Sequence, residues 1–267
     1  MRERSTKEIL DGITAKMREQ EAADAAEAGV DVETWREQVA AMDRAEAEQA
    51  AAVALTRRVN AVLPSRLRGM TFETYEAPNA SCADAVVQCQ TWCADYHRWA
   101  LTHKLDESPP SLGMMLSGNP GAGKTHLAAS MVRALTELGM RCVFIDIPEF
   151  LASIRSTFDG GTAVVTVEQA ILAPLLVMDD LGAERETPWA VETLYVIINK
   201  RLSENRPMIF TTNLLFADIA DRAEGKVSTA ISDDGSGLYL RRIYSRLREI
   251  TGSLLILDAP DYRATMN

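Results

Sequence analysis

The sequence predicts an α/β protein with a parallel sheet that is covered by helices on both faces. From residue 112 onward, short apolar runs alternate with amphipathic stretches; the runs are LGMMLSG, RCVFIDI, PLLVMDD, PMIFTTN and SLLILD. Strands that alternate with helices are joined by crossovers, and crossovers place helices on the faces of a parallel sheet. A glycine-rich loop follows the first run and two acidic residues end the third. The same segment therefore holds the candidate functional residues.

Composition excludes several classes of protein. The chain of 267 residues is 47% hydrophobic and 25% charged, as expected for a protein with a core. Its apolar runs fall short of the ~20 residues of a membrane helix, and its charged N-terminus, MRERSTKEIL, lacks the apolar stretch of a secretory signal. Four cysteines are too few for a disulfide scaffold. We therefore expect a cytoplasmic protein with no membrane partner. A net charge of −10 argues against binding to duplex DNA by charge alone.

The N-terminal region differs in composition from the remainder. It is rich in Ala, Glu, Arg and Gln, which favour helices, and we expect helices at about 4–27 and 32–61, the second capped by Asp31. Four apolar residues share a face of the second helix: Val32, Trp35, Val39 and Met42. Two interpretations stay open. The helices pack on the main domain or form a loose coiled coil, or they are a docking surface for a partner protein.

A phosphate-binding loop follows the first predicted strand, which covers about 112–117. The motif G-x-x-x-x-G-K-[ST] is matched by Gly118, Asn119, Pro120, Gly121, Ala122, Gly123, Lys124 and Thr125. We expect these residues and the next one, His126, to contact the nucleotide. Glycines let backbone N–H groups surround a phosphate, and the helix that follows adds its positive N-terminal dipole. We expect Lys124 to reach the β- and γ-phosphates of ATP and the Thr125 hydroxyl to ligate Mg²⁺. The alternative is a turn without a ligand.

An acidic pair ends the strand Leu175–Asp180, which looks like a Walker B element. We expect Asp179 to hold the Mg²⁺ shell and Asp180 to polarise the attacking water. The second position is usually Glu, and Asp is one methylene shorter, so the rate of hydrolysis stays open. The pair could instead cap the next turn.

Two further groups are candidates for sensing or stabilising the γ-phosphate. Asn213 ends the strand 207–212; it could instead simply start a turn. A basic helix begins near Leu238, and its Arg242 and Arg246 share one face. An arginine supplied to a neighbouring subunit stabilises charge in phosphoryl transfer; the alternative role is surface ion pairing.

Over about residues 63–260, the chain resembles the AAA+ ATPases of the bacterial helicase-loader group, the DnaC/DnaI-type loaders and their IstB-like relatives. The resemblance is carried by five segments taken as a set: LSGNPGAGKTHLA, FIDIPEFLASIRSTF, LLVMDDLGAE, IFTTN and RIYSRL. The resemblance implies a P-loop NTPase with a five-stranded αβα core, in which the Walker strands flank the sensor strand, and no C-terminal lid domain. It also implies that Asn213 is sensor I and that Arg246, or alternatively Arg242, is an arginine finger.

The resemblance further implies function and organisation. We expect an ATPase that uses ATP and Mg²⁺ and loads the replicative hexameric helicase during initiation of DNA replication. Residues 1–62 would bind the helicase, 63–111 would be a linker and helix, and 112–267 the ATPase core. Single-stranded DNA and further copies of the chain in the ATP state would be its other partners. Alternatives are a transposition helper ATPase and a nucleotide-gated DNA-binding scaffold with little hydrolysis; a P-loop kinase is the least favoured.

Three segments carry weaker hypotheses. The family implies that the short helix predicted at 148–158 contributes to holding single-stranded DNA, through Phe150, Arg155 and Phe158, although the two phenylalanines could belong to the core. A second segment contains closely spaced cysteines and histidines: Cys82, Cys89, Cys93, His97 and His103. Some of them could ligate zinc, but we favour a role in helix packing. The long loop at 217–240 suggests no function.

Overall fold

The chain forms two compact units, Met1–Arg57 and Arg58–Asn267, in the computed structural model. The structure describes residues 6–102, 111–183, 187–214, 221, 236–250, 253–259 and 261. The long loop predicted at 217–240 lies outside these residues, apart from Asp221 and the start of a helix at Ser236, and so does His103. Within the described part of the chain, no helix combines the length and apolarity that a membrane crossing requires.

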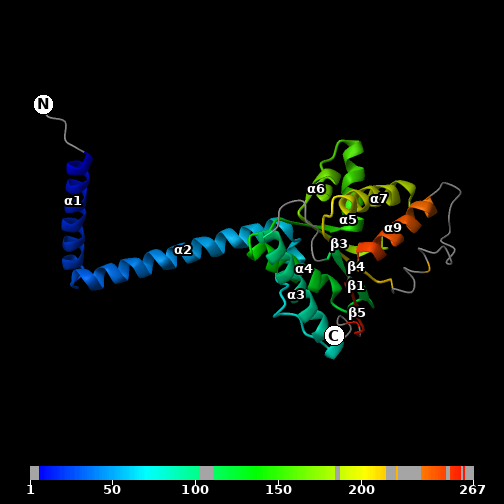
Figure 1. The fold of residues 1–267 in the computed structure, drawn as a ribbon, viewed down its shortest axis with the longest axis horizontal. Coiled ribbons are helices and arrows are strands. Elements are labelled where there is room, and N and C mark those ends of the chain that lie inside the picture. Colours follow the sequence, from blue (N-terminus) through cyan, green and yellow to red (C-terminus); the bar gives the residue numbers. More distant parts are fainter. Residues whose placement is uncertain are drawn as a thin grey trace. The chain divides into compact units, whose positions relative to one another are not determined.

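The first unit is helical, as its composition predicts. It consists of α1 (Thr6–Glu27) and most of α2 (Val32–Val62) (Figure 1). Asp31 caps α2, because its carboxylate accepts the backbone N–H groups of Glu33 and Thr34 at 3.0 Å. An ion pair of 2.6 Å between Arg36 and Glu21 links the two helices. The predicted apolar face is only partly covered: Val32, Trp35 and Val39 are half-buried and Met42 is exposed.

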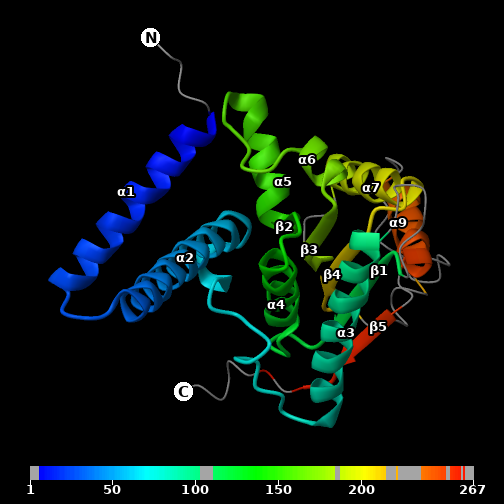
Figure 2. The same cartoon turned by 60° about the vertical axis from the view of Figure 1, so that its left-hand side comes forward.

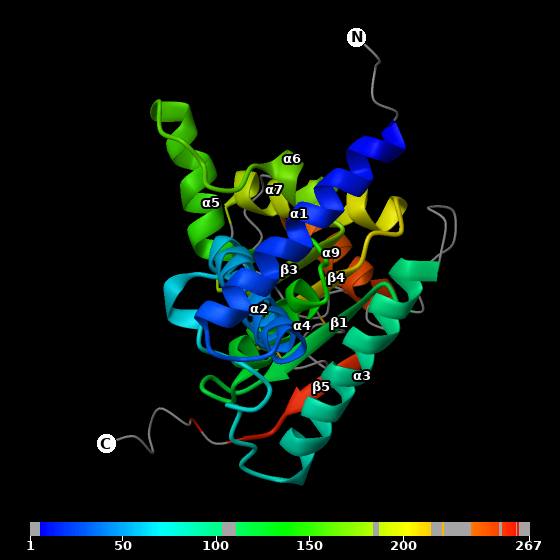
Figure 3. The ribbon, with the colours of Figure 1, turned by 90° about the vertical axis from the view of Figure 1, so that its left-hand side faces the viewer.

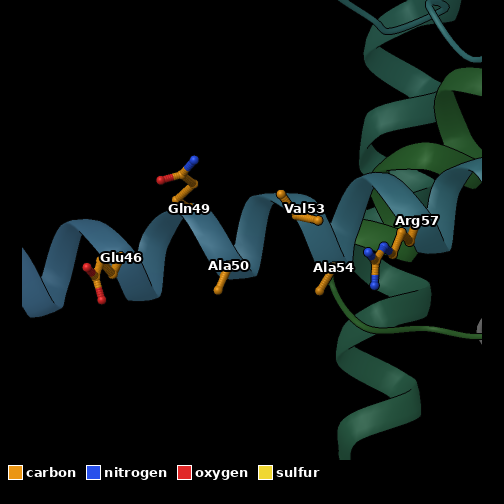
Figure 4. A pocket seen from close by; sticks show the side chains of 6 residues that line it. All are labelled: Glu46, Gln49, Ala50, Val53, Ala54 and Arg57. Carbon is orange, nitrogen blue, oxygen red and sulfur yellow. The ribbon is translucent and has the colours of Figure 1, made fainter.

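A shallow hollow lies along α2 farther toward its C-terminus (Figure 4). It is lined by Glu46, Gln49, Ala50, Val53, Ala54 and Arg57. Because one helix supplies the entire lining, the hollow is open to solvent and is not a candidate ligand site.

A five-stranded sheet forms the centre of the second unit, in the order β2-β3-β4-β1-β5 (Figure 2). Every neighbouring pair is parallel. The strands are β1 (Gly113–Gly118), β2 (Cys142–Asp146), β3 (Leu175–Leu181), β4 (Met208–Thr212) and β5 (Ser253–Leu257). All five correspond to predicted apolar runs. The phosphate-loop strand β1 and the acidic strand β3 both pair with β4, so the order implied by the family resemblance is confirmed.

Helices cover both faces of the sheet (Figure 3). They are α3 (Ala80–Thr102), α4 (Lys124–Glu137), α5 (Ile147–Ser156), α6 (Val167–Leu172), α7 (Pro188–Ser203) and α9 (Ser236–Ile250); short 3₁₀ turns are η1 (Ser65–Leu67) and η2 (Thr157–Asp159). On one face, α7 and α9 share a buried cluster with Met115, Met178 and Phe210 of the strands. The α3–α4 pair lies against the sheet too, and the Cys89 thiol is 3.8 Å from the Met114 sulfur of β1.

The helix predicted at 148–158 is shorter than expected. The α-helix ends at Ser156 and continues into the 3₁₀ turn η2, which ends where Gly160 adopts a left-handed conformation. Phe150 is buried in the core, whereas Arg155 is exposed and Phe158 is 73% exposed. Only the second aromatic ring is therefore accessible to a ligand.

The cysteines of α3 are buried. Burial raises the pKa of the Cys89 thiol to about 12 and that of Cys93 well above its ordinary value. Their contacts are those of helix packing: the Cys89 thiol lies 3.8 Å from the Met114 sulfur and the Cys93 thiol lies 4.0 Å from the Met131 carbonyl oxygen. Among the described residues, no group of three or more His, Cys, Asp and Glu side chains is arranged to hold a metal ion.

Candidate nucleotide-binding site

The glycine loop connects the end of β1 to the start of α4. Gly121 and Gly123 have φ angles of +77° and +86°, in the left-handed region that favours glycine. A Cβ at Gly121 would lie 1.8 Å from Oδ1 of Asp261, and one at Gly123 would lie 2.5 Å from Cε2 of Tyr75. Both glycines are therefore required by conformation and by space.

The loop has the polar groups that an anion requires. Lys124 is 7% exposed, and its Nζ donates to the carbonyl oxygens of Gly118 at 2.9 Å and Asn119 at 2.8 Å. The N-cap of α4 is Gly123, and no side chain caps the helix. The N–H groups of the first turn are thus not taken by a capping side chain, and the helix dipole adds positive potential at the same point. This arrangement fits a polyphosphate.

Asp179 joins the acidic strand to the glycine loop. Its Oδ1 accepts the hydroxyl of Thr125 at 2.9 Å and that of Thr211 at 2.6 Å, and the residue is 2% exposed. Burial raises its pKa; the two hydroxyls oppose this effect, and repulsion from Asp146 and Asp180 adds to it. A buried carboxylate whose charge is disfavoured in this way is well suited to receive a cation.

Asp180 has an unusual backbone. Its φ of +64° is in the left-handed region, and the side-chain amide of Asn213 donates to its Oδ1 at 3.3 Å. Asp and Asn are several-fold enriched in this region among residues other than glycine. The conformation therefore gives a physical reason for Asp where Glu is usual, and the structure places Asn213 beside the acidic pair.

The donor set at this position fits Mg²⁺. Thr125 and Asp179 present hard oxygen atoms, and their side chains are already within hydrogen-bond distance of each other. Mg²⁺ bound with nucleotides usually takes one or two carboxylates together with phosphate oxygens and water, so no three-carboxylate cluster is needed.

Sequence reasoning missed a segment that lies against the loop. His126, predicted as a nucleotide contact, has its Nε2 2.9 Å from the Thr71 carbonyl oxygen and 3.2 Å from Thr74 Oγ1. The Tyr75 hydroxyl donates to the Ala122 carbonyl oxygen at 3.1 Å, and its ring meets the His126 ring edge-on at 5.3 Å. Nothing in the spacing of residues 71–75 indicated this contact, because it joins segments about 50 residues apart in an irregular loop.

The two candidate arginine fingers are engaged by their own chain. Arg246 forms a 2.6 Å ion pair with Glu249, one turn along α9. Arg242 lies over the Tyr195 ring, with its guanidinium carbon 5.9 Å from the ring centre. Both stand on the helix that packs against α7, and neither of these contacts is with the glycine loop.

Fold and site together define an ATP-binding domain of the AAA+ type. Residues 110–234 match the family described as IstB-like ATP binding protein. The chain therefore contains an IstB-like ATP-binding domain, and it is distantly homologous to the DnaC and DnaI replicative helicase loaders.

Individual relatives support this assignment. The replicative helicase loader DnaI of Bacillus subtilis is 28% identical over 109 residues, and the replicative helicase loader DnaC of Escherichia coli (strain K12) is 30% identical over 105. These matches cover 40% and 37% of this chain but only 35% and 41% of the relatives. A crystal structure of the DnaC helicase loader superposes with a TM-score of 0.56 and 26% identity, covering 73% of this chain and 100% of that one.

Proposed function

We propose that this protein is an ATPase that loads the replicative DNA helicase onto single-stranded DNA. The observation that carries the proposal is the loop–carboxylate site, in which Lys124, Thr125 and Asp179 are assembled as ATP binding requires. Homology to two helicase loaders extends it from nucleotide binding to helicase loading. We place the protein in the cytoplasm, where these partners meet.

The chain's own residues divide the work of binding and hydrolysis. Lys124 exchanges its two carbonyl partners for phosphate oxygens, with which its positive charge interacts more strongly. Thr125 and Asp179 would hold Mg²⁺, which would neutralise phosphate charge when bound. Asp180 accepts a proton from the attacking water. Asn213, whose side-chain amide donates a hydrogen bond to Asp180, orients that water relative to the γ-phosphate.

A second subunit completes the site in this proposal. Arg246 stands on α9 and turns toward Glu249 in the single chain. In a homo-oligomer formed with ATP, it leaves Glu249 and reaches the γ-phosphate held by the neighbouring subunit, with Arg242 as the alternative. An exposed ion pair of this kind contributes only about 0–1 kcal/mol, so its release costs little.

The remaining segments are assigned to the partners. Residues 1–62 bind the helicase, because most of them belong to a separate compact unit, Met1–Arg57, whose second helix has a partly uncovered apolar face. Residues 63–111 connect that unit to the ATPase core at 112–267. Arg155 and Phe158, both exposed, contact single-stranded DNA by charge and by stacking.

The family match also favours a second candidate. Residues 110–234 match an IstB-like description, and the core is common to both groups. The alternative is thus a transposition helper ATPase that acts with a transposase on target DNA. A nucleotide-gated scaffold with little hydrolysis is a further outcome, because Asp180 is shorter than the usual Glu.

A reconstitution with purified proteins tests the proposal. The full chain, the replicative helicase encoded in the same genome and closed circular single-stranded DNA are mixed, with or without ATP, and separated by gel filtration. We expect the helicase to elute with the circles only when the chain and ATP are both present, and not with Lys124→Ala. No association with the helicase would refute the proposal, and ATP-dependent assembly with the transposase on duplex DNA would establish the alternative.

A further inference from the structure

The acidic end of β3 contains a β-bulge. In the ladder between β3 and β4, Met178 pairs with Phe210 and Leu181 pairs with Thr212. Two residues, Asp179 and Asp180, therefore stand opposite the single residue Thr211. A bulge leaves the extra residue without its ladder partner and changes the direction of its side chain. Here the extra residue belongs to the acidic pair itself.

The hydroxyl of Thr211 compensates for the missing ladder bond. Its oxygen accepts the backbone N–H of Asp180 at 2.8 Å and donates its hydrogen to Oδ1 of Asp179 at 2.6 Å. A hydroxyl has one hydrogen, so these two bonds fix its direction. One buried side chain, 1% exposed, thus holds the backbone of one carboxylate residue and the side chain of the other.

We infer that Thr211 is the positioning residue of the site, setting the Asp179 carboxylate for Mg²⁺ and the bulged Asp180 for water activation. The inference rests on the proposed function and adds a residue to it. Without the hydroxyl, the N–H of Asp180 loses the acceptor that Thr211 provides, and the Asp179 carboxylate loses one of the two hydroxyl donors that it has among the described residues. The φ of +64° at Asp180 is then no longer held, because such conformations persist only where the surroundings enforce them.

The neighbouring residue provides a matched control. Thr212 is also fully buried on β4, and its hydroxyl likewise makes two bonds, donating to the Leu181 carbonyl oxygen at 2.7 Å and accepting the Leu214 N–H at 3.1 Å. Neither bond involves a carboxylate. Thr212→Val therefore removes as much hydrogen bonding as Thr211→Val from the same strand, without touching the acidic pair.

Titration of a fluorescent ATP analogue, in Mg²⁺ and separately in EDTA, measures the effect of Mg²⁺ on affinity. In Thr211→Val we expect this effect to fall by about tenfold to a hundredfold, the usual loss when a residue supporting a metal ligand is removed. Affinity in EDTA should stay within about twofold, since Lys124 and the loop are untouched. In hydrolysis assays with Mg²⁺, KM for ATP should rise with the lost Mg²⁺ effect, and kcat should also fall because Asp180 is misplaced. Thr211→Ser keeps the hydroxyl and should retain the wild-type ratio, as should Thr212→Val.

Several results would overturn the inference. One is an unchanged effect of Mg²⁺ on affinity in Thr211→Val. Another is a loss of this effect in Thr212→Val or in Thr211→Ser that equals the loss in Thr211→Val. A third is a wild-type affinity that does not depend on Mg²⁺. If Thr211→Val does not fold, Thr211→Ala is measured instead; failure of both to fold while Thr212→Val folds would show a purely structural role. Absence of hydrolysis in the wild type would count against the proposed function, whereas the binding ratio would still decide the role of Thr211.

Discussion

Replacing Asp179 with Asn should stabilise the free protein and weaken its response to Mg-ATP. The amide keeps an oxygen that accepts from Thr125 and Thr211, so both hydrogen bonds survive. The substitution also removes the negative charge of Asp179, a residue that is 2% exposed and whose carboxylate is repelled by Asp146 and Asp180. The charge is unfavourable in the empty site and becomes useful only when a cation is bound.

The size of both effects follows from burial and from ligand linkage. We expect the free energy of unfolding of the free protein to rise by about 1 kcal/mol, the low end for a buried polar group that lacks full compensation. In a unit the size of Arg58–Asn267, this raises the melting temperature by about 2–4 °C. Mg-ATP at about 100 times Kd adds about 2.7 kcal/mol to the wild type, and only about 0.4 kcal/mol after an about hundredfold loss of affinity. The ligand shift should thus fall from about 5–11 °C to about 1–2 °C.

Thermal unfolding with and without Mg-ATP measures both quantities, and Asp146→Asn is the control. Asp146 lies at the same sheet edge, paired with Asp179 in the ladder, but forms a 2.8 Å ion pair with Arg66. Its replacement should leave the free protein unchanged or slightly weaker, with the ligand shift preserved. A lower melting temperature in free Asp179→Asn together with an undiminished ligand shift would refute the reasoning.

The pH dependence of this comparison has a definite sign. Burial raises the folded-state pKa of Asp179 above its ordinary value of 3.8. The folded protein therefore holds this proton more tightly than the unfolded chain, and stability falls as pH rises from 3.8 through the raised pKa. The advantage of Asp179→Asn should be absent below that range and complete above it, as measured by denaturant unfolding at a series of pH values.

Three further predictions concern the other candidate residues. Lys124→Ala should weaken ATP binding by about a hundredfold or more, because charge-assisted bonds are worth about 1.5–3 kcal/mol each, while circular dichroism stays unchanged; equal affinity in analogue titration would disprove the site. Asp180→Asn should bind Mg-ATP normally and release phosphate slowly, and unchanged turnover would move water activation elsewhere. Arg246→Ala mixed with Lys124→Ala should recover ATPase activity, because one subunit supplies the pocket and the other the arginine; mixed assemblies without activity would exclude action between subunits.

Sequence alone predicted the elements that depend on local spacing. A glycine loop between a strand and a helix is specified by consecutive residues, so Gly118 to Thr125 could be placed from their spacing. The five strands were predicted because apolar runs in a parallel sheet are buried on both faces. The order with β4 between β1 and β3 followed from the family resemblance rather than from spacing, and it is confirmed.

Tertiary structure decided how those elements meet. The bond from Thr211 to Asp179 spans 32 residues and depends on the register of β4 against β3, including a bulge that no sequence spacing predicts. The contact of His126 with Thr71 spans 55 residues and joins an irregular segment to a helix. Sequence by itself determined which chemical groups end the strands, because strands and loops are encoded locally. The structure determined which groups touch, because register and loop path are set by packing across the whole sheet.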